Sequence, residues 1–412
     1  MSTRHRRTLI LLYMRQVSAG LLIYQPIFYI FLQSRGITAA EFSLLLMFYN
    51  IGTLGLVVPA GRFADKVGRK WALTAANAIY TIGTLIIATG HSLAVFAFAE
   101  VLYSLAIALD AGVHSAFLFE FLRAQGRERE YYRFDAFGQF MFLFFGALGT
   151  LLGGYLAEIG LAVPIFATAA FTALGIPCAY FLEEPRFSKT AEEKIEGLET
   201  RMAPPPKKNG WAETWGVARR ILATPGLRWA VGLTVIWFWS RQFVNLYLPG
   251  PYFKFLGLEL RMFGVLAALL TLAAGFIAFF SRRIIQRPDL KWISLTGLLL
   301  IPGCLATMGL IRSRVGLIGF FFFAIPIGLC TAVTNTLLNR QFSDHENRAT
   351  FLAIVDFCVR LTASAVTLYL GKILTDQTRG IPVALVAAAG FSAVVACILL
   401  PGIFKFARDP QP

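Results

Sequence analysis

The sequence has 412 residues, of which 57% are hydrophobic and only 15% are charged. A soluble globular domain carries about 25% charged residues, so this composition excludes an ordinary soluble core. The formal net charge of +15 would suit nucleic-acid binding in a soluble protein, but in a membrane protein the distribution of that charge matters more than its sum.

Apolar segments long enough to cross a bilayer recur along the whole chain. About 20 predominantly apolar residues cross the hydrocarbon region as an α-helix. Windows of this kind predict twelve spans, at residues 8–33, 38–62, 71–90, 92–122, 131–158, 161–182, 226–253, 259–280, 292–311, 315–339, 349–375 and 382–406. Because backbone polar groups in lipid must be satisfied within each segment, the expected fold class is an all-α membrane protein.

Basic residues gather on one side of these spans. With the N-terminus inside the cell, most of the 38 Lys and Arg residues fall on the cytoplasmic side, which is the positive-inside pattern. We therefore expect an integral protein of the plasma (inner) membrane with both termini cytoplasmic, a lipid bilayer as partner and no nucleic acid. The basic start resembles a signal peptide, but the apolar stretch continues through Phe31, so we expect a retained first span.

A polar segment divides the spans into six and six. It contains "EEPRFSKTAEEKIEGLETRMAPPPKKNG", which is too charged to enter lipid. The sequence therefore predicts an N-terminal bundle at 1–182, a cytoplasmic linker loop at 183–225 and a C-terminal bundle at 226–412. An offset of 221 residues aligns the halves and pairs Lys70 with Lys291. Such duplication is common in transporters and predicts a parallel repeat.

The loop after the second span reads "GRFADKVGRK", residues 61–70. The positive-inside rule explains its basic residues, but not the spacing of Gly61, Asp65 and Gly68. The pattern resembles the G-x-x-x-D-x-x-G-R-K loop of the major facilitator superfamily. The six-plus-six layout extends the resemblance over the whole chain, and "SRRIIQRPDLK" (281–291) stands where the family has a weaker copy.

The resemblance implies two bundles that alternate between two open states. In the family the loop Asp lies against the start of the eleventh span, where a helix N-terminus favours an anion. Gly61 is expected to allow close helix packing, and Gly68 to adopt a positive φ. We expect a latch that closes when the halves meet on the cytoplasmic side, made of Gly61, Asp65, Gly68, Arg69 and Arg348.

The fourth span is the richest in ionisable groups, which are costly in lipid and therefore functional candidates. Asp110 and His114 are one helical turn apart and could load and release protons, or could form a structural hydrogen bond between helices. Glu120 could take part in coupling or pair with Arg123 or Arg127. Many family members carry an Arg in the outer half of this span; here that half contains Glu100 and no Arg, so that proton-transfer role is not carried over.

Polar residues on other spans are candidates to line a central cavity, which the family builds from spans one, four, seven and ten. Arg241 in mid-membrane needs an anion, a carboxylate or water, and Asp110 or an anionic substrate is its expected partner. Arg15 could instead snorkel to the interface, and Asp356 with Arg360 is expected to form an internal ion pair. The predicted cavity-lining set is Arg15, Tyr24, Gln25, Asn50, Trp237, Arg241, Asn245, Thr331 and Asn335.

The fifth span carries a glycine-rich pattern. Drug and metabolite antiporters of the family have G-P-x-x-G-G here, and Gly149, Thr150, Gly153 and Gly154 reproduce it with Thr in place of Pro. Glycines at this spacing would equally serve close packing between spans five and eight.

Three functions remain open from the sequence. The first is a proton-coupled exporter of small organic or amphipathic compounds, and the second is uptake or facilitated transport of an organic anion neutralised by Arg15 and Arg241. The third is a receptor or scaffold that transports nothing. The five Cys lack metal-ligand spacing, and there is no nucleophile with an adjacent base. We therefore expect no enzyme activity, cofactor or metal, and a monomer.

Overall fold

The computed structural model describes residues 3–184, 210–285, 290–342, 348–374 and 380–406. In the first half the helices are α1 (Thr3–Gly20), η1 (Gln25–Ile27), α2 (Phe28–Ser34), α3 (Ala39–Val67), α4 (Arg69–Thr89), α5 (Leu93–Asp110), α6 (Val113–Arg123), η2 (Glu128–Glu130), α7 (Tyr131–Ile159) and α8 (Val163–Tyr180). The second half follows as α10 (Gly210–Ala223), α11 (Pro225–Gln242), η3 (Phe243–Tyr247), α12 (Pro249–Phe255), α13 (Leu260–Ile285), α14 (Lys291–Leu310), η4 (Arg314–Gly316), α15 (Leu317–Phe322), α16 (Ala324–Gln341), α17 (Arg348–Ile373) and α18 (Gly380–Phe406).

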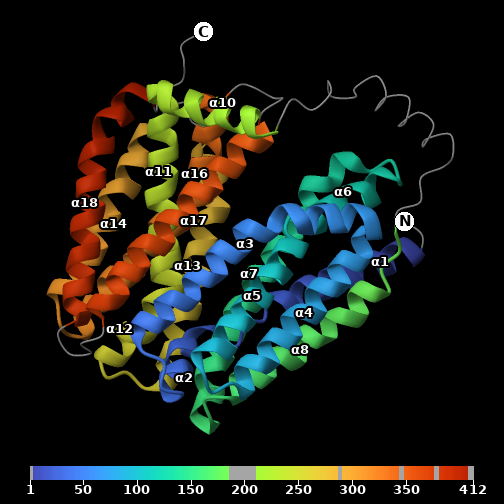
Figure 1. The fold of residues 1–412 in the computed structure, drawn as a ribbon, viewed down its shortest axis with the longest axis horizontal. Helices are drawn as coiled ribbons and strands as arrows, with labels where there is room; N and C mark the ends of the chain where they lie inside the picture. The colour runs from blue at the N-terminus through green and yellow to red at the C-terminus, as the bar shows by residue number, and fades with distance from the viewer. Residues whose placement is uncertain (1–2, 185–209, 286–289, 343–347, 375–379, 407–412) are drawn as a thin grey trace.

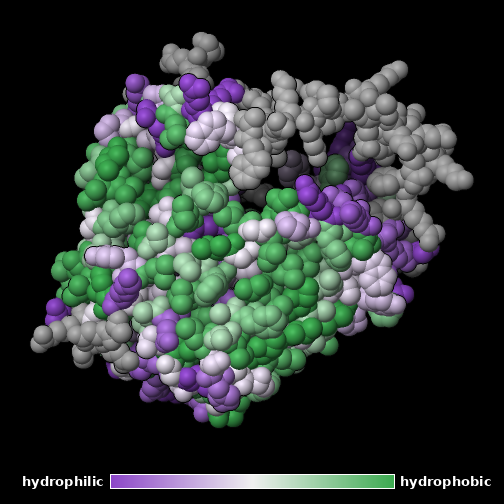
Figure 2. Space-filling view, in the orientation of Figure 1, coloured by the Kyte–Doolittle hydropathy of each residue, from purple (hydrophilic) through white to green (hydrophobic). Residues whose placement is uncertain are grey.

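The helices have the length and hydropathy of membrane spans. Within the described ranges, eleven are long and apolar enough to cross a bilayer, or twelve if the bent pair Thr214–Ala223 and Pro225–Tyr247 is one span. Hydrophobic residues cover the middle of the face in Figure 2, and hydrophilic ones gather toward its ends. The described residues form no strand, so the predicted all-α membrane fold is confirmed.

The helix bounds repeat between the halves. α3 and α13 begin 221 residues apart, at Ala39 and Leu260, and α4 and α14 end 221 residues apart, at Thr89 and Leu310. These bounds agree with the parallel repeat read from the sequence.

The expected linker loop contains a helix. Residues 185–209 lie outside the described residues, but 210–223 form α10, which is bent by 99° from the following helix. Val217 and Ile221, one turn apart, are buried, so α10 buries one face of its own. The prediction of a loop was wrong here because an amphipathic period lay within a polar stretch.

Each of the four spans predicted to line the cavity is interrupted. The first breaks between Gly20 and Gln25, the fourth between Asp110 and Val113, and the tenth at Phe323. The seventh contains the π-helical turn η3. Interrupted helices at membrane depth need protein or water around the freed backbone groups, so these breaks mark an interior site.

The two halves touch on one side of the molecule and separate on the other. We call the side where α1 begins and α18 ends the terminal side, and the opposite one the far side. In Figure 1 the halves converge at α2 and α12 and diverge toward the terminal side, where Figure 2 shows a hollow. The far side is closed by α7 packed on α13 and by α2 packed on α12, and α3 contacts α17.

Candidate functional site

Arg15 stands at the centre of a polar cluster inside the first half. Its Nη1 lies 2.7 Å from Asp110 Oδ1 and 3.4 Å from Asn77 Oδ1, and its Nη2 lies 3.0 Å from His114 Nδ1. The Arg15 side chain is 2% exposed, whereas that of Asp110 is 38% exposed. Arg15 therefore does not snorkel, and the carboxylate proposed for Arg241 is instead the partner of Arg15.

The cluster forms at the break in the fourth span. α5 ends at Asp110, and Gly112 with φ +76° starts α6, so Asp110 and His114 do not share one continuous helical face as expected. Only glycine adopts this left-handed backbone conformation at little energetic cost. The conformation of Gly112 changes the direction of the chain between α5 and α6. The carbonyl groups at the end of α5 favour a cation, which Arg15 supplies.

The contact with Arg15 fixes the state of His114. A guanidinium group only donates hydrogen bonds, so Nδ1 of the imidazole must accept, and the ring is neutral with its proton on Nε2. Protonation of either Asp110 or His114 would remove an acceptor from a buried cation. The cluster thus holds two protonatable groups that share one fixed positive charge.

In the second half, Arg241 is partly exposed and contacts α16. Its Nη1 donates to Thr331 Oγ1 at 3.2 Å, and its guanidinium carbon lies 5.6 Å from the centre of the Phe238 ring. Thr331 and Asn335, one turn apart on α16, are both exposed. No carboxylate of the described chain pairs with Arg241, so two of the predicted cavity residues, Arg241 and Thr331, are in contact around a cation without a counter-charge.

Trp237 does not line this cavity. Its side chain is buried and packs on Gly297 of α14, within the core of the second half. The absence of a side chain at Gly297 makes room for the indole ring. The prediction that Trp237 lines the cavity was therefore wrong, because its ring packs into the core of the second half.

Asn50 and Gln25 lie at contacts between the halves. Asn50 is buried, and its Oδ1 accepts a hydrogen bond of 3.0 Å from Gln242 Nε2, a residue that the sequence did not single out. Gln25 lines two cavities, and the smaller one also includes Asn245 and Thr150.

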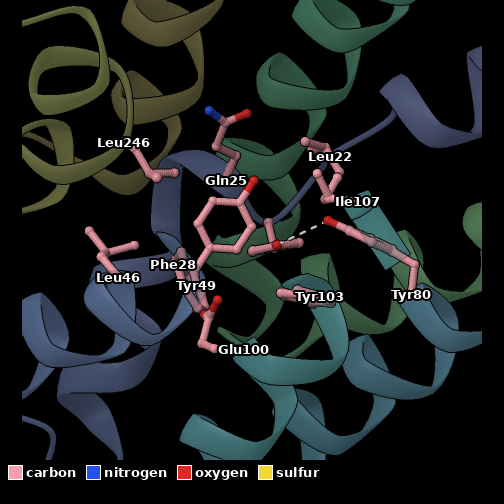
Figure 3. A pocket seen from close by; sticks show the side chains of 11 residues that line it. Leu22, Gln25, Phe28, Leu46, Tyr49, Tyr80, Glu100, Tyr103, Ile107 and Leu246 are labelled. Atoms are coloured by element: carbon pink, nitrogen blue, oxygen red, sulfur yellow. Dashed lines mark hydrogen bonds between the residues drawn. The ribbon is translucent and has the colours of Figure 1, made fainter. Parts of the chain in front are cut away.

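The larger of these cavities has a volume of about 140 Å³ and lies on the far-side half of the first bundle. Figure 3 shows aromatic rings around it and the carboxyl group of Glu100 among them. Tyr24, predicted to line the central cavity, lies here, and the sequence did not single out Tyr49, Tyr80, Tyr103 or a role for Glu100. A carboxyl group within a span was the one signal that could have pointed to this place.

Asp65, the acidic residue of the predicted latch, has no partner among the described residues in the observed state. Asp65 is exposed and forms no ion pair or hydrogen bond with the described chain, and a Cβ atom at Gly61 would meet nothing within 4 Å. Gly68 has φ +95°, as expected for the turn between α3 and α4. Arg348 begins α17, and its side chain lies outside the described residues. The close packing expected at Gly61 is therefore not formed in this state.

Glu120 has a partner that the sequence did not suggest. Its Oε1 lies 2.6 Å from Arg69 Nη2, which joins the end of the fourth span to the "GRFADKVGRK" loop. Arg127, one of its two expected partners, pairs with Glu130 at 2.7 Å. The expected pair of Asp356 and Arg360 is confirmed at 2.8 Å.

The glycine pattern of the fifth span lets three helices approach closely. A Cβ atom at Gly153 would lie 1.8 Å from the Ile23 carbonyl oxygen, and one at Gly154 would lie 2.7 Å from the Arg261 carbonyl oxygen. Gly149 lies against Leu21 in the same way, and Thr150 Oγ1 donates to the Gly146 carbonyl at 2.7 Å. Packing with spans one and eight accounts for these glycines.

Comparison with known proteins agrees with this geometry. The family model described as Major Facilitator Superfamily matches residues 16–366. The chain belongs to the major facilitator superfamily. It is therefore a membrane transporter, and its substrate is a small molecule. No curated protein matches the sequence.

Solved structures share the fold at low sequence identity. The nucleoside transporter NupG has a TM-score of 0.71 at 12% identity, covering 98% of this chain and 100% of that one. A bacterial homologue of the human lysosomal transporter Spinster, inward-facing and unoccupied, has a TM-score of 0.72 at 14% identity, with 100% of both chains covered. The peptide transporter POT in complex with sulfate has a TM-score of 0.70 at 16% identity, covering 97% of this chain and 95% of that one.

Proposed function

We propose that this superfamily transporter is a proton-coupled exporter of small organic or amphipathic compounds, of the drug and metabolite antiporter branch. The observation that supports it is Arg15, a buried cation held by both Asp110 and His114. We further propose that it works as a monomer in the plasma membrane, with the two bundles at 1–182 and 226–412 and with the terminal side in the cytoplasm.

The coupling follows from the charge balance around Arg15. In the observed state Asp110 is 38% exposed and can exchange a proton with the opening on the terminal side. Loss of that proton restores the ion pair with Arg15, while gain of it leaves a buried guanidinium without its counter-charge. Because an uncompensated buried charge is costly, protonation favours a rearrangement at the break between α5 and α6.

The predicted latch belongs to the same cycle. In the proposed orientation the observed state faces inward, and Asp65 would reach the start of α17 only after the halves close on the cytoplasmic side. Substrate would enter from the cytoplasm as Asp110 releases its proton, and the outward-facing state would exchange substrate for a proton.

One observation favours the second candidate, uptake of an organic anion. Arg241 is partly exposed and has no carboxylate partner in the described part of the chain, so it can neutralise an anionic group. In this candidate Arg15 contributes little, because Asp110 already neutralises it.

Proton fluxes in sealed vesicles separate the two candidates. A thermal-shift screen in detergent first supplies a compound that binds. We expect this compound, added on the terminal side, to drive proton movement in the opposite direction, and we expect the variants Asp110→Asn and His114→Gln to reduce this movement at least tenfold. Size-exclusion profiles confirm that each variant is folded.

An anion transporter would give a different pattern. Transport would follow the membrane potential rather than the pH gradient, would persist in His114→Gln and would be lost in Arg241→Gln. That result would contradict the proposed exporter.

A further inference from the structure

The cavity of about 140 Å³ is lined by the carboxyl group of Glu100, which has no positive partner among the residues that the structure describes. Glu100 is 3% exposed, and no basic side chain of the described residues pairs with it. Its backbone carbonyl accepts a hydrogen bond from Ser104, but its carboxylate oxygens form no hydrogen bond with the described chain. An isolated carboxylate is expensive to bury, so Glu100 stays protonated and neutral unless a cationic ligand offsets the charge of its ionised form.

Aromatic rings form the rest of the wall. Tyr24, Phe28, Tyr49, Tyr80 and Tyr103 all line the same cavity, and in Figure 3 Glu100 lies at one edge of this group, next to Tyr49 and Phe28. Ring faces attract organic ammonium groups, and cages of aromatic side chains bind quaternary ammonium ions in this way. A carboxyl group inside such a cage can lose its proton when a cation binds, and the resulting carboxylate favours cations over anions.

Hydrogen bonds hold most of these rings in place. The hydroxyls of Tyr24 and Tyr80 are 3.2 Å apart, the Tyr80 and Tyr103 rings stack at 4.5 Å, and Tyr103 donates to Thr84 at 3.1 Å. Tyr49, by contrast, makes no hydroxyl hydrogen bond with the described chain and is free to bind a polar group of the ligand. The cage is therefore formed before any ligand enters.

The cavity is separate from the Arg15 cluster. Glu100 and Asp110 are ten residues apart on α5, about 15 Å along the helix axis. A cavity of about 150 Å³ holds a molecule the size of benzene, so the available space suits a small ammonium head group. Leu246 of η3 forms part of the wall, so a ligand here would contact both halves.

We propose that the Glu100 cavity binds the ammonium group of a small organic cation, which makes a cationic compound the cargo class of this transporter. The inference rests on the proposed export function for its biological role, but binding in the cavity does not depend on proton coupling. Glu100 supplies the charge, and the tyrosine rings supply cation–π contacts.

Choline and its uncharged carbon isostere dimethylbutanol test the site. The two have nearly the same shape, so a difference in their affinity, measured by isothermal titration calorimetry in detergent, reports the positive charge. We expect choline or tetramethylammonium to bind and dimethylbutanol to bind at least tenfold more weakly. Equal binding of choline and dimethylbutanol, or no binding of either ammonium ion, would overturn the proposal. This comparison needs no variant.

Variants then place the site. Glu100→Gln should weaken choline binding at least tenfold. Glu128 is an exposed acid outside the cavity, so Glu128→Gln should leave choline binding unchanged. Tyr49→Phe should retain most of the affinity for choline because the aromatic ring remains. Tyr49→Leu, which removes the ring, should lower this affinity several-fold. Unchanged choline affinity in folded Glu100→Gln would contradict the proposal.

The two proposals fail separately. If choline binds through Glu100 but no transported compound moves protons, only the proposed coupling is wrong. If proton-coupled export is measured and ammonium ions do not bind, only the cationic cargo is wrong.

Discussion

Arg15 and Asp110 form an ion pair whose two members differ in burial. The Arg15 side chain is 2% exposed and that of Asp110 is 38% exposed. Removing one member of a buried pair leaves the other charge without compensation, and the penalty depends on how deeply the remaining charge is buried. The two single variants should therefore differ in stability although they break the same contact.

We expect Asp110→Asn to lower the free energy of unfolding by about 3 kcal/mol, because it leaves the Arg15 charge buried without a counter-charge. Arg15→Gln should lower it by only about 1 kcal/mol, because the remaining Asp110 reaches solvent. Equilibrium unfolding in mixed micelles measures the free energy of unfolding of both variants. Asp356→Asn, which breaks the partly exposed pair with Arg360 at 2.8 Å, is the control. Equal losses for Asp110→Asn and Arg15→Gln would contradict this account.

At the scale of helices, packing of α7 depends on positions without side chains. Gly153 and Gly154 bring α7 against the broken part of the first span and against α13. The atoms that would clash there are backbone carbonyl oxygens, which cannot move aside as a flexible side chain can. Overpacking of this kind typically costs 1–3 kcal/mol, occasionally more.

We expect Gly153→Ala to reduce the free energy of unfolding by about 2 kcal/mol or more. Gly390→Ala is a matched control, because Gly390 lies within α18 and a Cβ atom there would meet nothing within 4 Å. That variant should be neutral or stabilising by up to about 1 kcal/mol, since Ala favours helix over Gly. The thermal unfolding of both is followed in detergent, and a Gly153→Ala protein as stable as the parent would refute the packing argument.

At the scale of the whole molecule, the halves are closed on the far side and open on the terminal side. Ser43 and Tyr247 join them by a hydrogen bond of 2.7 Å, and the Phe42 ring stacks on Tyr247 at 5.5 Å. Asp65 takes no part in this state. If the Asp65 carboxylate stabilises only the state that is closed on the terminal side, its removal should shift the population toward the observed state, which is open on that side.

We therefore expect Asp65→Asn to leave the fold intact, to cut transport and to favour the terminal-open state. In a background without native cysteines, a cysteine at Asn335 should react faster with a maleimide in Asp65→Asn, and a cysteine at Ser43 should react more slowly. Lys66→Gln, a neighbouring exposed charge, should change neither rate. Unchanged labelling at both positions would argue against a latch.

The sequence by itself determined the class of molecule. Length and hydropathy of the spans predicted an all-α membrane protein, and the spacing in "GRFADKVGRK" identified the superfamily, because both signals are local in the chain. The positive φ of Gly68 and the ion pair of Asp356 with Arg360 followed from the same local rules.

Tertiary structure decided which polar groups meet. Arg15 pairs with Asp110, Glu120 with Arg69, and Trp237 faces Gly297, each across helices that are distant in sequence. Helical periodicity ranks the faces of one helix, but it does not say which neighbour each face will touch. The break at Gly112 also cancelled the expected shared face of Asp110 and His114. The Glu100 cavity needed five rings from several helices, and only the folded chain brings them together.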